Sequence, residues 1–137
     1  MTKGVYMAKY VYPAVFSPED GGYSVSFPDL DGCYTCGDDL ADAMYMAADV
    51  LALTLWDMEE NKVAIPNSST IDSVSLRSDE FVSYIAADTV EYRKKVDTKS
   101  VKRTVSLPHW LDEIATAQNV NFSQTLQNAL KAELNIA

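Results

Sequence analysis

Residues 99–108 read KSVKRTVSLP, a short alternation of polar and apolar side chains that stops at a proline. The pattern predicts a β-strand, and two amphipathic helices are expected after it, over roughly residues 108–118 and 122–135. One strand and two helices in roughly 40 residues bury too little surface to fold alone. A second copy would pair the two strands as an antiparallel ribbon over four helices. A ribbon of this kind fits the major groove of DNA.

The side chains of this strand divide between two faces because successive residues point in opposite directions. Val105 and Leu107 are expected to face the helices and to contribute to dimerisation. The outer face then carries Lys102, Thr104 and Ser106, which can hydrogen-bond to base edges. The alternative is that these residues only form the polar surface of an ordinary dimerisation strand.

Phosphate contacts are expected beside the ribbon and at the start of the last helix. Arg103 lies on the inward register, so we expect its side chain to reach sideways to a phosphate. Asn121 can cap the last helix, and Gln124 follows at the spacing of a capping box. The exposed backbone amides near this cap, those of Phe122, Ser123 and Gln124, would suit a phosphate. Leu126 and Leu130 belong to the apolar stripe that would pack the dimer.

Charge divides the chain into two parts. Residues 1–97 hold 7 Lys or Arg and 17 Asp or Glu, a net charge of −10, whereas residues 98–137 hold 4 and 3, a net charge of +1. A strongly acidic domain repels nucleic acid and attracts basic partners. We therefore expect two domains, 1–97 and 98–137, that have different partners.

The overall composition bounds the class of protein. Hydrophobic residues make up 47% of the chain, which suits a globular core, and no apolar run reaches the roughly 18 residues of a membrane span. The first residues show no signal-peptide pattern, so the cytoplasm is the expected location, with no membrane contact.

The acidic part shows the pattern of an α+β domain. Alternating residues 8–16 and 23–27 predict a hairpin, in which Pro13 indicates an edge position or a bulge. A short strand over 33–35, a long helix from Asp38 or Asp39, a strand over 80–86 and a short helix over 89–95 follow. The order β-β-β-α-β-α predicts a mostly antiparallel sheet with one long helix across it.

The long helix carries more apolar residues than one buried face needs. The first stripe runs from Leu40 to Met58 at helical spacing. A second stripe consists of Met46, Val50, Leu53 and Trp56. It is either covered by the segment after residue 61 or forms a contact between subunits, and the sequence favours neither.

Two motifs resemble known families. Residues 22–33 (GYSVSFPDLDGC), followed by Gly37-Asp38-Asp39 and Ala43, resemble the N-terminal domain of HicB antitoxins. The tail, with KRTVSLP at 102–108 and NFSQ at 121–124, resembles a ribbon-helix-helix module. Together they resemble the subset of HicB proteins that carry such a tail.

The resemblance implies a fold and two partners. The N-terminal domain would have a partial RNase H-like fold and would mask a HicA toxin, a small basic protein that cleaves mRNA. The tail would bind operator DNA and repress the shared operon, as a homodimer or a tetramer. The candidate toxin contacts are acidic residues, and the sequence does not select among them: Asp29, Asp31, Asp38, Asp39 and Asp42.

Catalytic and cofactor roles are not expected, although two patterns raise them. Cys33 and Cys36 have CxxC spacing, but the chain has no second cysteine pair and only one histidine, so a zinc site is not expected. The aspartates near residues 29–42 could suggest a metal-dependent nuclease, yet they fall in turns and helix caps, where aspartate is common.

A stand-alone repressor whose acidic domain senses a ligand remains the main alternative to the antitoxin function.

Overall fold

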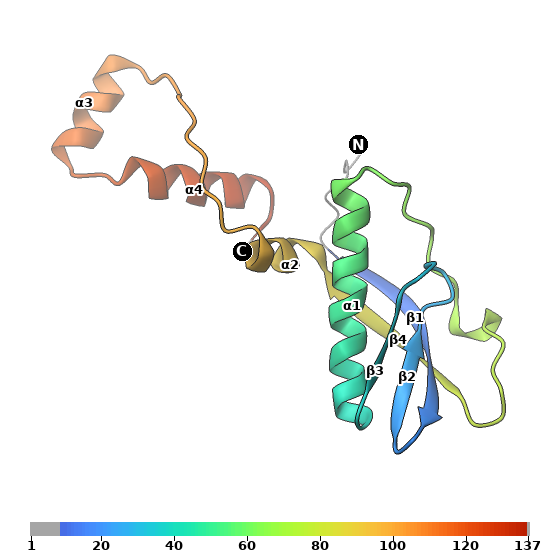
Figure 1. The fold of residues 1–137 in the computed structure, drawn as a ribbon. Coiled ribbons are helices and arrows are strands. Elements are labelled where there is room, and N and C mark those ends of the chain that lie inside the picture. The colour runs from blue at the N-terminus through green and yellow to red at the C-terminus, as the bar shows by residue number, and fades with distance from the viewer. Residues whose placement is uncertain (1–8, 137) are drawn as a thin grey trace. The chain divides into compact units, whose positions relative to one another are not determined.

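A computed structural model describes residues 9–136 of the chain (Figure 1). The chain divides into two compact units, one ending at Lys99 and one beginning at Ser100. Within the described residues, no helix combines the length and the apolar character that crossing a membrane requires.

The first unit begins with the expected hairpin. Strand β1 (Lys9–Glu19) pairs antiparallel with β2 (Gly22–Ser26). β1 extends further toward the turn than the sequence indicated, and β2 begins and ends one residue earlier, because a two-residue turn at Asp20-Gly21 joins them. Both turn residues have positive φ, 46° and 84°, which is the conformation that matches the twist of a hairpin.

Strands β3 (Tyr34–Gly37) and β4 (Phe81–Asp88) complete an antiparallel sheet with the order β3-β2-β1-β4. β1 pairs with β4 over Lys9–Phe16 but with β2 only from Val15 onward. Pro13 therefore lies in the half of β1 that has a neighbour on one side only. At Pro13, β1 has the expected edge position, although further along the chain β1 is an inner strand.

Helix α1 (Leu40–Glu60) covers one face of this sheet (Figure 1). Its stripe of Ala43, Ala47, Leu51 and Leu55 is fully buried against strand residues that include Phe16 and Val25. Burying each large apolar side chain stabilises the fold by about 1.5–3 kcal/mol. Gly37 brings the end of β3 close to α1, since a Cβ there would lie 2.3 Å from the backbone nitrogen of Ala43.

The second stripe of α1 is covered only in part. Helix α2 (Thr89–Val96) packs beside α1, and the rings of Tyr92 and Trp56 lie 5.7 Å apart between their centroids. Leu53 remains 42% exposed. Part of the stripe therefore packs against α2, and part of it faces outward.

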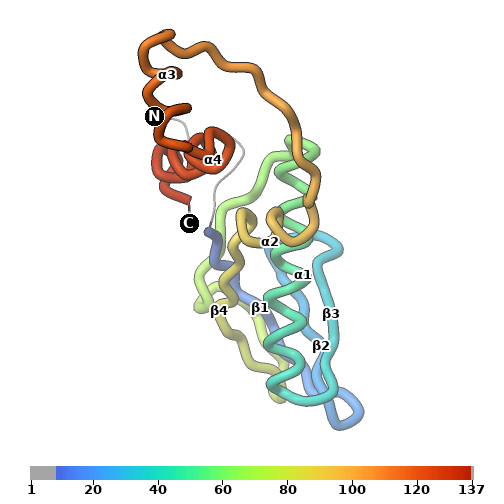
Figure 2. Tube along the Cα trace, turned by 90° about the vertical axis from the view of Figure 1, so that its left-hand side faces the viewer, coloured from blue at the N-terminus to red at the C-terminus, as the bar shows by residue number. Residues whose placement is uncertain are grey.

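A long connection, residues 61–80, returns the chain from α1 to β4 and contains a short 3-10 turn, η1 (Ile71–Ser73). It runs along the sheet rather than extending away from it (Figure 2). Two tyrosines help to hold it there: the Tyr12 hydroxyl donates to the Pro66 carbonyl, and the Tyr84 hydroxyl accepts from the Ile71 amide at 3.1 Å.

The second unit holds helices α3 (His109–Ala117) and α4 (Phe122–Glu133), close to the expected boundaries. Residues 97–108 have no regular secondary structure, so the expected strand is not formed in the single chain. A strand needs a neighbour to accept and donate its backbone hydrogen bonds, and the described residues supply none here. No residue of 100–136 is buried, so this unit has no core of its own.

Candidate functional sites

Asp29, one of the candidate contact residues, has a structural role inside the first unit. Its carboxylate accepts hydrogen bonds from the Ser69 amide at 2.9 Å and from the Ser69 hydroxyl at 2.5 Å. These two residues are 40 positions apart, so the pair fixes the 61–80 connection to the turn after β2. The carboxylate is consequently already occupied.

Asp39 and Asp42 shape the start of α1. Asp39 is the N-cap, and its side chain accepts from the Asp42 amide at 2.8 Å. Asp42 in turn accepts from the Asp38 amide at 2.8 Å. Carboxylates at this position also interact favourably with the helix dipole. Asp31 and Asp38 are exposed, so of the five candidates these two are the most available to a partner.

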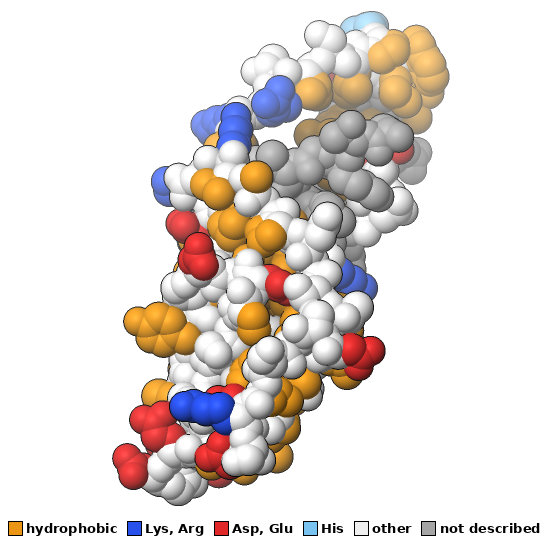
Figure 3. Space-filling view, turned by 90° about the vertical axis from the view of Figure 1, so that its right-hand side faces the viewer, with side chains coloured by type: hydrophobic (Ala, Val, Ile, Leu, Met, Phe, Trp, Pro, Cys, Tyr) orange, Lys and Arg blue, Asp and Glu red, His pale blue; other side chains and the backbone are white. Residues whose placement is uncertain are grey.

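Acidic charge is spread over the first unit. Figure 3 shows acidic side chains in several separate places on one face. The 29–42 stretch is therefore only one part of an acidic surface.

A buried carboxylate that the sequence reasoning missed lies at the end of α1. Glu59 is 2% exposed, and its Oε1 lies 3.0 Å from Nη2 of Arg93 on α2. Its Oε2 accepts from the Tyr10 hydroxyl at 2.8 Å and from the Thr89 hydroxyl at 2.9 Å. Glu59 continues the buried row of Leu51 and Leu55 at intervals of four residues, and that position was the available signal.

The surroundings of Glu59 also affect Tyr10. Burial, and then the hydrogen bond and charge of Glu59, raise the pKa of Tyr10 far above the ordinary tyrosine value. The phenol therefore stays protonated and remains a donor to the carboxylate. Together these contacts join β1, α1 and α2.

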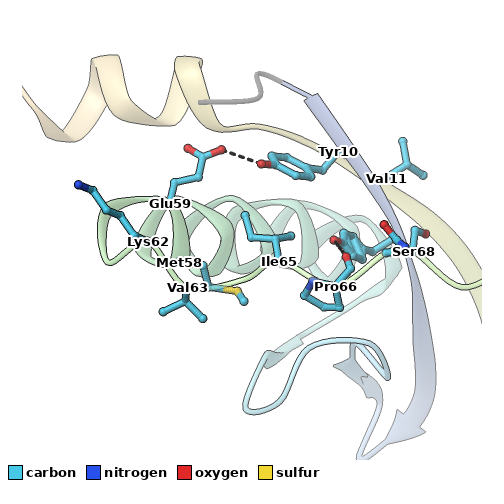
Figure 4. A pocket seen from close by; sticks show the side chains of 11 residues that line it. Tyr10, Val11, Met58, Glu59, Lys62, Val63, Ile65, Pro66 and Ser68 are labelled. Atoms are coloured by element: carbon cyan, nitrogen blue, oxygen red, sulfur yellow. Dashed lines mark hydrogen bonds between the residues drawn. The ribbon is translucent and has the colours of Figure 1, made fainter. Parts of the chain in front are cut away.

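A pocket of about 420 Å³ opens beside this network (Figure 4). Val11 and Tyr12 of β1 line one side, and Val63, Ile65 and Pro66 of the following connection line the other. Figure 4 shows Glu59 directed toward Tyr10, and Lys62 lies near the end of α1. The pocket is mostly apolar and its one carboxylate is already bonded, so it offers space for binding rather than groups for catalysis.

Among the described residues, neither the two cysteines nor the side chains of types that can bind metals are arranged as a reaction centre. Cys33 is buried, its thiol accepts from the Thr54 hydroxyl at 3.4 Å, and burial raises its pKa. A raised pKa disfavours the reactive thiolate. Cys36 is exposed and free. Among residues 9–136, no three His, Cys, Asp or Glu side chains are placed to hold a metal ion.

The residues expected to contact DNA are all exposed in the second unit, as are the apolar residues expected at the dimer contact. These are Lys102, Arg103, Thr104, Ser106, Phe122, Ser123 and Gln124, with Val105, Leu107, Leu126 and Leu130. Asn121 is the N-cap of α4, and its Oδ1 accepts from the Gln124 amide at 2.9 Å. The Gln124 side chain bonds to Asn128 at 3.0 Å, so it is used within the helix and not for the second half of a capping box.

Comparison with protein families gives a match over most of the chain. Residues 12–130 match a family described as "HicB_like antitoxin of bacterial toxin-antitoxin system". The chain is 29% identical, over 125 residues, to "Antitoxin HicB 2" of Photorhabdus laumondii, a match that covers 79% of this chain and 88% of that protein.

Solved structures show a similar fold. A chain of the toxin–antitoxin complex from Streptococcus pneumoniae has a TM-score of 0.60 at 28% identity, covering 91% of this chain and 99% of that one. The antitoxin HicB of Burkholderia pseudomallei has a TM-score of 0.52 at 19% identity, covering 88% and 96%. At that identity the second likeness concerns the fold alone.

Proposed function

This chain belongs to the HicB-like antitoxins of bacterial toxin–antitoxin systems, and on that premise we propose that it carries out two separate binding tasks. The acidic first unit binds and masks a HicA-type toxin. The second unit pairs with a second copy and binds operator DNA, which represses the operon. The observation that carries this division is the charge: −10 over residues 1–97 and +1 over residues 98–137.

Toxin masking needs a surface and no chemistry. An acidic surface attracts a basic protein and speeds its association. The S. pneumoniae chain to which this one is similar was solved in a toxin–antitoxin complex, which supports a toxin partner here. Masking would cover the toxin's RNA-binding face and its catalytic residue. The role is regulatory, as it is for the family.

The second unit is proposed to be a ribbon-helix-helix dimer. Its helices expose apolar residues such as Leu126 and Leu130, and no described residue of the unit is buried. Covering these side chains with a second copy would create the missing core and would let the two 101–107 segments pair as strands. Light scattering should then find an even number of chains; a monomer would contradict the proposal.

Operator recognition would use the outer face of the paired ribbon. Lys102, Thr104 and Ser106 would contact base edges, and Arg103 would contact a phosphate. At the start of α4, the Gln124 amide is already bonded to Asn121, so the amides of Phe122 and Ser123 are the better candidates for a backbone phosphate. With four Lys or Arg residues in 98–137, binding should be modest and strongly weakened by salt.

The proposal is tested by purifying the tagged protein from its own host in mild salt and measuring the intact masses of what accompanies it. A stoichiometric small basic protein that is toxic when expressed alone is the expected result. A dimer that carries only operator DNA would contradict toxin masking.

That second outcome would favour a ligand-sensing repressor instead. The apolar pocket of about 420 Å³ between β1 and residues 62–68 is the observation in favour of that alternative. A thermal shift with small molecules from the host, lost when the pocket is filled by Val63→Trp, would support it.

A further inference from the structure

A second hollow, of about 220 Å³, lies in the first unit where α1, β4 and α2 meet. These elements are neighbours in both views of the backbone (Figures 1 and 2). Four alanines contribute to its lining: Ala48 and Ala52 from α1, and Ala86 and Ala87 from β4. Because alanine has no side chain beyond Cβ, helix and strand leave a shallow apolar floor between them.

Two tyrosines and three carboxylates surround this floor. Tyr45 is 68% exposed, and Tyr92 lines the side formed by α2. The charged residues of the lining are Asp49, Asp88, Glu91 and Lys95, three acidic and one basic. The site therefore combines aromatic rings, an apolar floor and a negative rim.

The three carboxylates are not equally available. Asp88 caps α2 by accepting from the Val90 and Glu91 amides, and Glu91 is paired with Lys94 at 2.8 Å. Within residues 9–136, the carboxylate of Asp49 has no hydrogen-bond or ion-pair partner. Asp49 is thus the acceptor that a partner could use without breaking a contact of the fold.

The helix that presents Asp49 increases the negative potential. α1 carries Asp42, Asp49, Asp57, Glu59 and Glu60 but no Lys or Arg. Three of these acids lie in the last turn, where the helix dipole disfavours negative charge. Arg93 offsets Glu59 and Glu60, but it is not part of the hollow. A cation approaching α1 from outside meets no positive charge on this helix, and Lys95 of α2 is the one basic residue in the lining of the hollow.

We propose that this hollow receives a Lys or Arg side chain of the toxin partner, an inference that rests on the proposed function. The aliphatic stem of such a side chain would lie on the alanine floor, its charged end would bind Asp49, and Tyr45 would cover it. An aromatic and an acidic group around a small pocket suit an anchoring residue of an interface.

The face of the sheet opposite α1 lacks this chemistry along the row that contains Tyr34. Tyr34 is 71% exposed there, and its row across the sheet continues through Ser26, Val15 and Val82. No residue of that row is charged. This row offers no charged anchor for a basic partner, which makes Tyr34 a suitable tyrosine control.

The experiment compares Asp49→Lys and Tyr45→Ala with Asp72→Lys, in η1, and Tyr34→Ala. The control pair changes one exposed acid and one equally exposed tyrosine outside the hollow. The probe is a catalytically inactive form of the toxin encoded beside this chain, titrated by calorimetry at two salt concentrations. Circular dichroism and thermal melts check that each variant folds.

We expect the two hollow variants to weaken toxin binding by at least about tenfold, and Asp49→Lys to reduce the salt dependence. The control variants should bind within about twofold of the wild type. Wild-type affinity in both hollow variants would overturn the inference while leaving toxin masking intact. If the wild type itself does not bind the toxin, the proposed function fails, and with it the inference.

Discussion

Arg93 on α2 and Glu59 on α1 form an ion pair in which the Nη2–Oε1 distance is 3.0 Å and the carboxylate side chain is 1% exposed. Arg93 also pairs with the neighbouring Glu60. The second oxygen of Glu59 accepts from Tyr10 and Thr89, so one carboxylate joins three elements. The buried charge of Glu59 is tolerated because both of its carboxylate oxygens are bonded.

Removing Arg93 should therefore destabilise the first unit strongly. Arg93→Ala leaves the Glu59 carboxylate buried without its cation, and we expect a loss of about 3 kcal/mol in the free energy of unfolding. Urea denaturation followed by circular dichroism measures it. Arg77→Ala is the control, since the Arg77 side chain is 77% exposed and that of its partner Glu80 is 10% exposed, and it should destabilise the unit less than Arg93→Ala does. Equal effects of the two variants would contradict the assignment.

The stability of the same network should depend on alkaline pH. Tyr10 has a raised pKa in the folded protein, so above about pH 10 the unfolded chain releases a proton that the folded protein keeps. Stability then falls as pH rises. In Tyr10→Phe the free energy of unfolding should fall less steeply with pH, by up to the slope that one proton contributes. Because the variant lacks one hydrogen bond, it should also be about 1 kcal/mol less stable below about pH 10. Identical slopes between about pH 10 and 11 would show that Tyr10 titrates normally.

The contact between Asp29 and Ser69 should control the mobility of the 61–80 connection. Ser69→Ala removes the hydroxyl donor and keeps the backbone amide bond, so we expect faster hydrogen exchange and faster proteolysis over residues 63–73 with little change elsewhere. Ser68→Ala is the control because the Ser68 hydroxyl bonds only to the adjacent Ser69 carbonyl among the described contacts. Protection that is unchanged in Ser69→Ala would mean that other contacts hold the segment.

The two binding tasks should separate genetically. Lys102→Ala combined with Thr104→Ala is expected to abolish binding to the DNA upstream of the operon in a gel-shift assay, because both side chains lie on the proposed outer face. Neutralisation of the toxin in a growth assay should persist, and residues 1–97 alone should also neutralise. If the double variant loses neutralisation, the proposed division between the two units is wrong.

Local patterns predicted much of the fold. The hairpin, β4, α1 and the helices of the tail follow from periodicity and caps, because those signals lie within a few residues of one another. Asp39 was predicted as a cap and is one. The second stripe of α1 was left open by the sequence, and the structure shows it partly packed by Tyr92.

The missed features depend on residues far apart in sequence. Glu59 bonds to Tyr10, 49 positions away in the sequence, and to Thr89, 30 positions away. No sequence pattern around Glu59 indicates either partner. The bond between Asp29 and Ser69 joins residues 40 positions apart, so no local sequence pattern indicates it. The expected strand near residue 102 depends on backbone hydrogen bonds to a second chain, and a single chain does not supply them.

The stretch between α2 and α3 has a consequence for how the two tasks combine. Residues 97–108 have no regular secondary structure in the single chain. Once residues 101–107 pair as the ribbon, only residues 97–100 remain as a tether, and four extended residues span at most about 14 Å. Two second units paired on one operator would therefore each be linked to an acidic first unit by a tether of that length. A toxin bound by one unit would meet the other at a high effective concentration. The length of this tether would then set how many toxin molecules one operator-bound dimer can retain.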